Sequence, residues 1–409
     1  MNFKKITSAL LALATSLTVI SAVSCDANDN MDESTKSEQT TILEASSVIE
    51  ATNGEDISEN ESESSVSDTT ESGSEETTKE DSTSQVQNPQ GIGKSFFEYF
   101  DTVSYVYSYA GDGTETLDEN CEIVGDILSE YHKLFDIYYE YSGINNLCTV
   151  NKNAGGEPIE VSPKLIEFLK YAEELYTLTN GKMNIMMGSV LKLWHDERTY
   201  AASNPQSAKI PTNEALIEAS KYVGFEFLEI DEENNTVRIT DKNARIDVGA
   251  LGKGYATEKA AQALIEKGVK HYVLNIGGNI RIIGTKVNGE SWKTGIKNPE
   301  NPNYEFSAYL NLADTSCVTS GDYERYFTVD GKKYHHIIDG DTNMPAEYFS
   351  SITVICKDSG LADALSTALF CMSYEDGLRL VESIDGVGAL WIGRDGEVRV
   401  SERIKNIVI

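Results

Sequence analysis

The sequence predicts a mixed α/β (α+β) fold for residues 94–409. Helical and strand patterns alternate in this region without the strict strand–helix repeat that a parallel sheet requires. After Phe3, the aromatic residues begin at Phe96, so the side chains for a core lie beyond that point. Apolar residues make up 40% of the 409 residues, which suffices for one large or two modest domains.

The first half of this region predicts one strand followed by helices. Alternating apolar positions indicate the strand, and apolar positions three and four apart indicate the helices. The expected elements are a strand at 96–109 and helices at 121–135, 162–179 and 213–223. Ser162 precedes a proline, a pair typical of a helix start. The segment 179–196 predicts a turn followed by an apolar loop into the core.

The second half predicts shorter strands and three further helices. Runs of β-branched residues bounded by glycine or asparagine indicate the strands. The expected strands are 236–240, 245–248, 272–276, 279–284 and 351–356, with a hairpin at 326–338, closing strands near the C-terminus, and helices at 255–267, 361–372 and 374–383.

The N-terminal part predicts a secretion signal at 1–25 and a linker at 26–93. Two lysines precede an apolar run at 9–23 that is short for a membrane span. The run ends at Cys25 in a segment that resembles a bacterial lipobox, although Ala22 replaces the usual leucine. We therefore expect Cys25 to be lipidated, with a cleaved signal and an incidental cysteine as the alternative. A lipid on Cys25 would anchor the protein to the outer face of the cell membrane.

The linker at 26–93 predicts a disordered segment. It holds 18 acidic and 2 basic residues and no aromatic residue. Such a segment cannot bury enough apolar surface to offset an ordering entropy of about 1–2 kcal/mol per residue. The whole chain has a formal net charge of −32, which argues against a nucleic-acid partner. Its six cysteines include no CxxC pair, so neither a zinc site nor a disulfide framework is indicated.

A glycine-rich segment at 246–255 joins a predicted strand to a predicted helix. Glycines allow the backbone to approach an anion, a helix N-terminus attracts negative charge, and Lys253 adds a full positive charge. The segment is neither a Walker A loop nor a clean GxGxxG motif. Two interpretations stay open, a phosphate site and a tight structural turn.

Asp363 and Thr367 stand four residues apart on an otherwise apolar helix. They therefore share one face, where a carboxylate needs a partner. Oxygen ligands of this kind suit Mg²⁺. The alternative is that Asp363 caps the helix and Thr367 bonds back to its own turn.

His335 and His336 are adjacent on the predicted hairpin, so only one of them can face a given site. A histidine on a strand is more often structural than catalytic, and this reading stays open from the residues alone.

Seven ordered segments resemble the FAD:protein FMN transferases, the ApbE family, whose members are often exported lipoproteins. The resemblance spans about 96–409 and implies a single catalytic domain built of two interwoven α/β subdomains. The segments are Phe100 to Val103, Gly181 to Asn184 with Trp194, Asp247 to Tyr255, Asn275 to Asn279, Ser320 to Arg325, His335 to Asp339, and Ala362 to Ala368.

The resemblance implies transfer of the FMN moiety of FAD, with Mg²⁺, to a Thr or Ser hydroxyl of an acceptor protein, with release of AMP. The implied catalytic residues are His336 and Asp363. The implied FAD contacts are Phe100, Tyr138, Lys182, Met183, Asn184, Asp247, Lys253 and Ile338, and the implied metal ligands are Asp363, Ser366, Thr367 and the carbonyl of Ala250. Asn184 replaces a common aspartate, and Asp339-Gly340 replaces a common Asp-Pro.

The partners that the resemblance implies are acceptor flavoproteins outside the cytoplasmic membrane, either redox-complex subunits or extracellular proteins. Two alternatives remain. With water in place of the acceptor hydroxyl, the same metal site would make the chain an FAD pyrophosphatase that yields FMN and AMP. A flavin-binding lipoprotein without catalysis would need neither Asp363 nor His336.

Overall fold

The computed structural model describes residues 90–299 and 306–409. The predicted signal, Cys25 and nearly all of the predicted linker lie outside the described residues. Strand β1 (Ile92–Phe96) pairs in full register with β2 (Ser104–Ser108), so the last two residues of the predicted linker belong to the fold.

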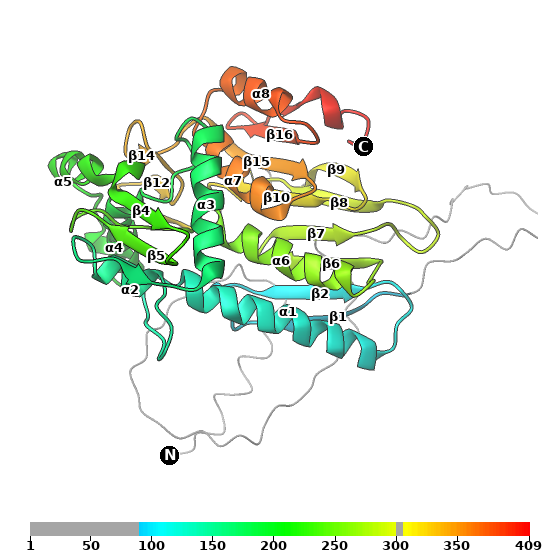
Figure 1. Ribbon diagram of the computed structural model, residues 1–409. Coiled ribbons are helices and arrows are strands. Elements are labelled where there is room, and N and C mark those ends of the chain that lie inside the picture. Colours follow the sequence, from blue (N-terminus) through cyan, green and yellow to red (C-terminus); the bar gives the residue numbers. More distant parts are fainter. Residues whose placement is uncertain (1–89, 300–305) are drawn as a thin grey trace, which may run out of the picture.

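An antiparallel sheet forms the centre of the molecule (Figure 1). Its strand order is β1-β2-β6-β7-β10-β15-β16-β17. Besides β1 and β2, the sheet contains β6 (Tyr272–Ile276), β7 (Asn279–Ile283), β10 (Ser316–Gly321), β15 (Phe349–Cys356), β16 (Gly388–Gly393) and β17 (Val398–Val400). Because neighbours along the chain are not always neighbours in the sheet, residues from distant segments meet at its ends.

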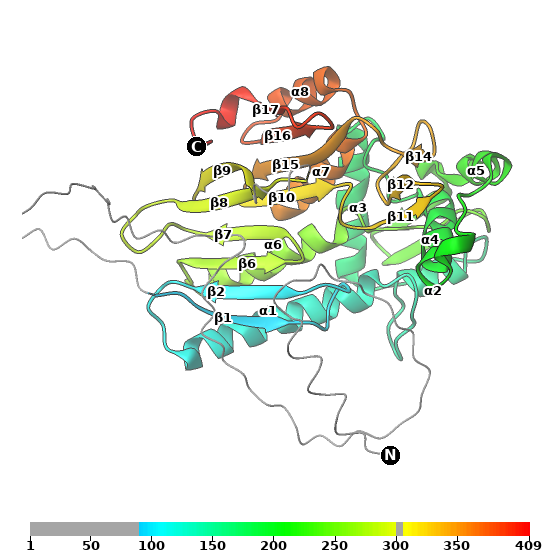
Figure 2. The same ribbon diagram turned by 180° about the vertical axis from the view of Figure 1, so that it is seen from behind.

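Helices cover one face of this sheet and a hairpin covers the other (Figures 1 and 2). The helices are α1 (Thr114–Phe135), α6 (Gly252–Glu266) and α7 (Ser359–Phe370), with α6 in contact with both others. The hairpin is β8 (Trp292–Lys297) with β9 (Phe306–Leu312). Successive side chains of a strand point to opposite faces of the sheet, and in β6 Leu274 packs on the helical side and Val273 on the hairpin side. Helix α8 (Tyr374–Ser383) contacts β16.

A second region lies beyond one end of the sheet, with α3 (Pro163–Leu178) standing between the two (Figure 1). The chain enters this region twice, which makes the two parts interwoven. The first passage holds α2 (Leu147–Lys152), β3 (Ile159–Glu160), α4 (Gly188–Ser203), α5 (Asn213–Ala219), β4 (Leu228–Asp231) and β5 (Thr236–Ile239), and the second holds β11 (Tyr326–Val329), β12 (Lys332–His335), β13 (Ile338–Asp339) and β14 (Met344–Pro345).

Three of the predicted elements are wrong. The expected strand at 96–109 is broken because Phe100 and Asp101 both have positive φ angles, 57° and 50°. The expected strand at 245–248 makes only a single bridge, from Arg245 to Met187, since no strand lies beside it. The segment 179–196 is not a loop throughout, because helix α4 begins at Gly188.

The cysteines of the described part, Cys121, Cys148, Cys317, Cys356 and Cys371, are buried free thiols. No helix within 90–299 or 306–409 combines the length and apolar character that a membrane span needs.

Candidate active site

The glycine-rich loop leads from the second region into α6. The backbone N–H of Asp247 donates to the carbonyl of Ile185 at 2.8 Å, which ties the loop to the segment before α4. Gly249 N–H donates to Asp247 Oδ1 at 2.9 Å and closes a tight turn. Leu251 stands at the N-cap of α6 and supplies no side-chain acceptor. Gly252 N–H donates to the Val248 carbonyl and Gly254 N–H to Asp363, so of the first three N–H groups that of Lys253 has no acceptor within the described residues.

Helices α6 and α7 meet where Gly254 faces Asp363. Gly254 N–H donates to Asp363 Oδ2 at 2.7 Å. A Cβ at position 254 would lie 2.4 Å from both Asp363 Cβ and the Ser359 carbonyl oxygen, so only glycine fits. Helix α7 begins at Ser359 and is capped by Asp358. The alternative in which Asp363 caps the helix is therefore wrong.

The predicted metal ligands lie around this contact. Ser366 Oγ lies 2.7 Å from Ser320 Oγ and 2.9 Å from the Asp363 carbonyl oxygen. Thr367 is half-buried one turn beyond Asp363, and Ala250 lies in the loop before α6. Asp363 is 6% exposed, and its Oδ1 makes no hydrogen bond within the described part of the chain.

This donor set fits a hard cation. No group of three or more His, Cys, Asp or Glu residues that could hold a metal occurs among the described residues. Mg²⁺ needs no such group, because it binds one or two carboxylates and completes its shell with water and substrate phosphates. One free carboxylate oxygen of Asp363, a threonine hydroxyl and a backbone carbonyl match that preference.

Lys253 lies beside the same contact. Its Nζ donates to Asn279 Oδ1, in β7, at 2.6 Å. Burial lowers the pKa of Lys253, Asp363 acts in the opposite direction, and the charge of Arg325 lowers it again. The lysine therefore lies within electrostatic range of both the carboxylate and the guanidinium.

The hydrogen bonds assign different roles to the two adjacent histidines. His335 is buried, its Nε2 donates to the Ala346 carbonyl at 2.8 Å, and its Nδ1 accepts from Ile337 N–H at 3.2 Å, so both ring nitrogens are satisfied. His336 Nδ1 donates to the Arg325 carbonyl at 3.2 Å. A carbonyl can only accept, so the proton sits on Nδ1 and the Nε2 of His336 presents a lone pair.

Burial, with the charges of Arg325 and Arg198 acting in the same direction, lowers the pKa of His336 to about 3. The imidazole is therefore neutral at physiological pH. Of the two histidines, His336 is the one with a free nitrogen and the charge state of a base.

A polar cluster lies between α4 and the glycine-rich loop, and it joins the predicted Tyr138 and Asp247 to two residues that the sequence did not reveal, His195 and Arg198. Arg198 Nη2 is 3.1 Å from His195 Nδ1, and Tyr138 Oη is 3.4 Å from the same nitrogen. Burial raises the pKa of Asp247, while the hydrogen bond from Gly249 N–H and the charge of Arg198 act against it. His195 and Arg198 stand three apart, a helical spacing that could have revealed them had 188–203 been predicted as a helix.

The predicted flavin-binding turn joins the two passages of the second region. Lys182 Nζ forms ion pairs with Asp339 at 3.1 Å and Asp341 at 2.8 Å. Asn184 holds the turn through its side chain, which accepts from Met186 N–H at 2.8 Å. Met183 is buried in the core, so it can offer a ligand only its backbone.

Two other predicted contacts differ in character. Ile338 is 8% exposed and packs in the small core of the second region. Phe100 lies at the break between β1 and β2, where its backbone N–H donates to His132 Nδ1 at 3.3 Å. The adjacent Asp101 lies within electrostatic range of Tyr138. This strained pair therefore borders the polar cluster.

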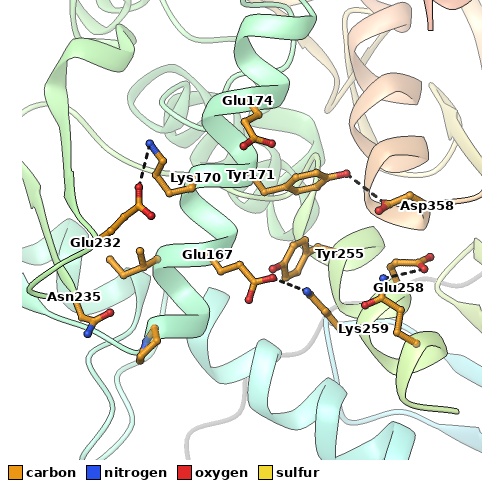
Figure 3. A pocket seen from close by; sticks show the side chains of 13 residues that line it. Glu167, Lys170, Tyr171, Glu174, Glu232, Asn235, Tyr255, Glu258, Lys259 and Asp358 are labelled. Carbon is orange, nitrogen blue, oxygen red and sulfur yellow. Dashed lines mark hydrogen bonds and ion pairs between the residues drawn. The ribbon is translucent and has the colours of Figure 1, made fainter. Parts of the chain in front are cut away.

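A separate cavity of about 490 Å³ lies between α3 and α6 (Figure 3). Its charged side chains are largely paired with one another, as Lys259 with Glu167 at 2.6 Å and Lys170 with Glu232 at 3.6 Å. None of the predicted site residues lines it. The cavity is therefore distinct from the candidate site.

Comparisons with known proteins identify the family to which this fold belongs. The model of the ApbE family matches residues 102–391. An FAD:protein FMN transferase of Treponema pallidum is 32% identical over 272 residues, which cover 63% of this chain and 73% of the relative. One of Vibrio cholerae is 30% identical over 270 residues, which cover 65% and 75%.

Solved structures give the same result. The ApbE protein of Thermotoga maritima has a TM-score of 0.67 and 30% identity, covering 78% of this chain and 99% of that one. The flavin transferase ApbE of Vibrio cholerae has a TM-score of 0.64 and 25% identity, covering 78% and 99%. The chain belongs to the ApbE family.

Proposed function

We propose that the chain transfers the FMN moiety of FAD to a Thr or Ser hydroxyl of acceptor proteins, in a Mg²⁺-dependent reaction that releases AMP. Its family and the names of its relatives make it a flavin transferase that uses FAD. The observation that supports the site is the contact between α6 and α7, where Gly254 orients Asp363 and Lys253 lies alongside.

Asp363, Thr367, Ser366 and the Ala250 carbonyl would hold the metal. When bound, Mg²⁺ would neutralise charge on the phosphoryl oxygens. Lys253 and the N-terminus of α6 add positive potential in the same place, so the chain itself favours an anion there. Such transfers depend mainly on positioning and electrostatics.

His336 would act as the base. Its neutral ring is held by the Nδ1–H bond to the Arg325 carbonyl, so Nε2 can take the proton of the acceptor hydroxyl. The hydroxyl oxygen forms a phosphoester bond to the FMN phosphorus while the bond to the bridging pyrophosphate oxygen breaks. AMP leaves with that oxygen and its electron pair, and the acceptor keeps the FMN.

The flavin and the rest of FAD would lie against the polar cluster and the turn before α4. Tyr138 and Asp247 present polar atoms there, and Asn184 and Lys182 fix the turn. We assign the remaining predicted contacts, Met183, Ile338 and Phe100, to the walls of the same pocket.

We also propose that lipidated Cys25 anchors the enzyme to the outer face of the cell membrane, with residues 26–93 as a tether. The acceptors would then be flavoproteins exposed on that side. Labelling cells with a fatty-acid analogue tests the anchor, since a Cys25→Ser chain should lose the label and appear in the medium.

The reaction is tested by incubating the chain with FAD, Mg²⁺ and an acceptor domain and measuring AMP and covalently bound FMN. Equal molar amounts of both support transfer. AMP without bound FMN would instead support the pyrophosphatase, and FAD binding without AMP would support a flavin-binding lipoprotein.

A further inference from the structure

Two arginines from distant segments approach the space beside His336. Arg198 belongs to α4, and Arg325 lies in the turn between β10 and β11. Neither forms a salt bridge within 90–299 or 306–409, although the chain carries 66 acidic and only 34 basic residues. Most other arginines of this acidic protein find a carboxylate, so two unpaired guanidinium groups together are unusual.

Arg198 has no ion-pair partner in the described part of the chain. Its Nη2 is 3.1 Å from His195 Nδ1, and a guanidinium can only donate, so His195 is neutral with its proton on Nε2. Tyr138, whose ring centroid lies 5.2 Å from that of His195, completes this side. Burial lowers the pKa of Arg198, and Arg325 lowers it further. Asp247 acts on Arg198 without forming an ion pair, so this partly buried cation still lacks an anion in direct contact, and such a cation is costly.

Lys253, Arg325 and Arg198 are linked electrostatically through Arg325, and Lys253 lies beside the predicted metal ligand Asp363. Arg325 acts electrostatically on both Lys253 and Arg198, whereas Asp363 acts on Lys253 and Asp247 on Arg198. Arg325 is therefore within electrostatic range of both other cations. Three cations linked in this way suit a ligand with two linked phosphates better than one with a single phosphate.

We propose that Arg198, with Arg325 beside it, binds a phosphate of the FAD pyrophosphate and thereby selects the dinucleotide over FMN. This inference rests on the proposed function. FMN has a single phosphate, which Lys253 and the start of α6 can hold without Arg198. The guanidinium fork matches phosphate oxygens in a way that a lysine cannot.

Equilibrium binding tests the inference without any turnover. The dissociation constants of the full chain for FAD and FMN would be measured by flavin fluorescence in the presence of a chelator. Arg198→Gln should weaken FAD binding at least about 10-fold, as expected for a lost charge-assisted hydrogen bond, and FMN binding less than about 3-fold. The matched control is Lys192→Gln, which removes an exposed cation of the same helix that is paired with Asp196 and should change neither constant.

Thermal unfolding supplies a second readout. Without ligand, Arg198→Gln should unfold at the same temperature as the parent chain or a higher one, because an unpaired charge is removed, while the upward shift caused by FAD should shrink. Unchanged FAD binding by Arg198→Gln, or equal losses for FAD and FMN, would overturn the inference while leaving the transferase intact. Failure of the parent chain to bind FAD would instead overturn the proposed function.

Discussion

The close approach of α6 and α7 predicts opposite effects for the same substitution at two helical glycines. Gly254→Ala would place a Cβ 2.4 Å from Asp363 Cβ and from the Ser359 carbonyl oxygen. Gly125→Ala, inside α1, would place a Cβ 3.6 Å from the Phe96 ring, an ordinary contact. Both changes replace glycine by a better helix former, so only the surroundings differ.

The magnitudes follow from these distances. Alanine in a helix interior is favoured over glycine by about 0.5–1 kcal/mol, and we expect Gly125→Ala to stabilise by that amount. Overpacking costs about 1–3 kcal/mol, and displacing α7 would also break the hydrogen bond from Gly254 N–H to the Asp363 carboxylate, worth about 1.5–3 kcal/mol. We expect Gly254→Ala to destabilise by about 2–4 kcal/mol and to lower FMN transfer, because Asp363 moves.

Urea unfolding followed by tryptophan fluorescence measures both variants, since Trp194, Trp292 and Trp391 are all buried. The urea midpoint should fall for Gly254→Ala and rise for Gly125→Ala at equal slopes. If Gly254→Ala matched or exceeded the parent chain, the two helices could not be as close as described, and the assigned orientation of Asp363 would be refuted.

Four further predictions concern buried titratable groups. Because His336 has a pKa near 3 in the folded chain, kcat/KM for FAD should not fall as the pH drops through 6.5. A fall near pH 6.5 that is absent in His336→Gln would contradict this. Between about pH 6.5 and 3, His336 is protonated in the unfolded chain and neutral in the folded chain, so the free energy of unfolding should fall as the pH drops through that window. The decrease in the urea midpoint from about pH 7 to about pH 4.5 should therefore be smaller for His336→Gln than for the parent chain. Glu258→Ala should cost about 3–5 kcal/mol in the same assay because Arg281, 1% exposed, would lose its nearer and buried carboxylate, 3.1 Å away, and keep only the half-exposed Asp314 at 3.6 Å. A loss under about 1 kcal/mol would show that the pair contributes little. Lys253→Met should weaken FAD binding, measured by calorimetry, about 10-fold and make the dissociation constant less dependent on salt. An unchanged dissociation constant would show that Lys253 does not bind FAD.

Local patterns predicted the regular elements well. The strand 272–276 and the helix 374–383 have the predicted bounds, because their apolar spacing and end signals agree. The break at Phe100 and Asp101 could not be seen, since nothing in either side chain demands a positive φ. Helix α4 was missed because its start carries no side-chain cap and its apolar positions are shared with the preceding loop.

The residues of the candidate site also differ in how far the sequence could predict them. Asp363 and Thr367 stand out by chemistry and spacing within one segment, whereas the choice of His336 over His335 came from the family resemblance. The partner of Asp363 does not, because the Gly254 N–H comes from a helix more than a hundred residues earlier in the chain. Arg198 and Arg325 are equally hidden, since an arginine without a carboxylate is visible only once its neighbours in space are known.

Intact mass spectrometry of an acceptor protein tests the central claim most directly. The full chain, Asp363→Asn and Asp376→Asn would each be incubated with FAD, Mg²⁺ and the acceptor, with and without a chelator. Asparagine can still accept the Gly254 hydrogen bond, so Asp363→Asn should fold, and Asp376 is an exposed residue of α8 that serves as control. We predict that the acceptor gains one FMN with the parent chain and the control, and gains none with Asp363→Asn or with chelator. FMN transfer by Asp363→Asn at the parental rate would contradict the account.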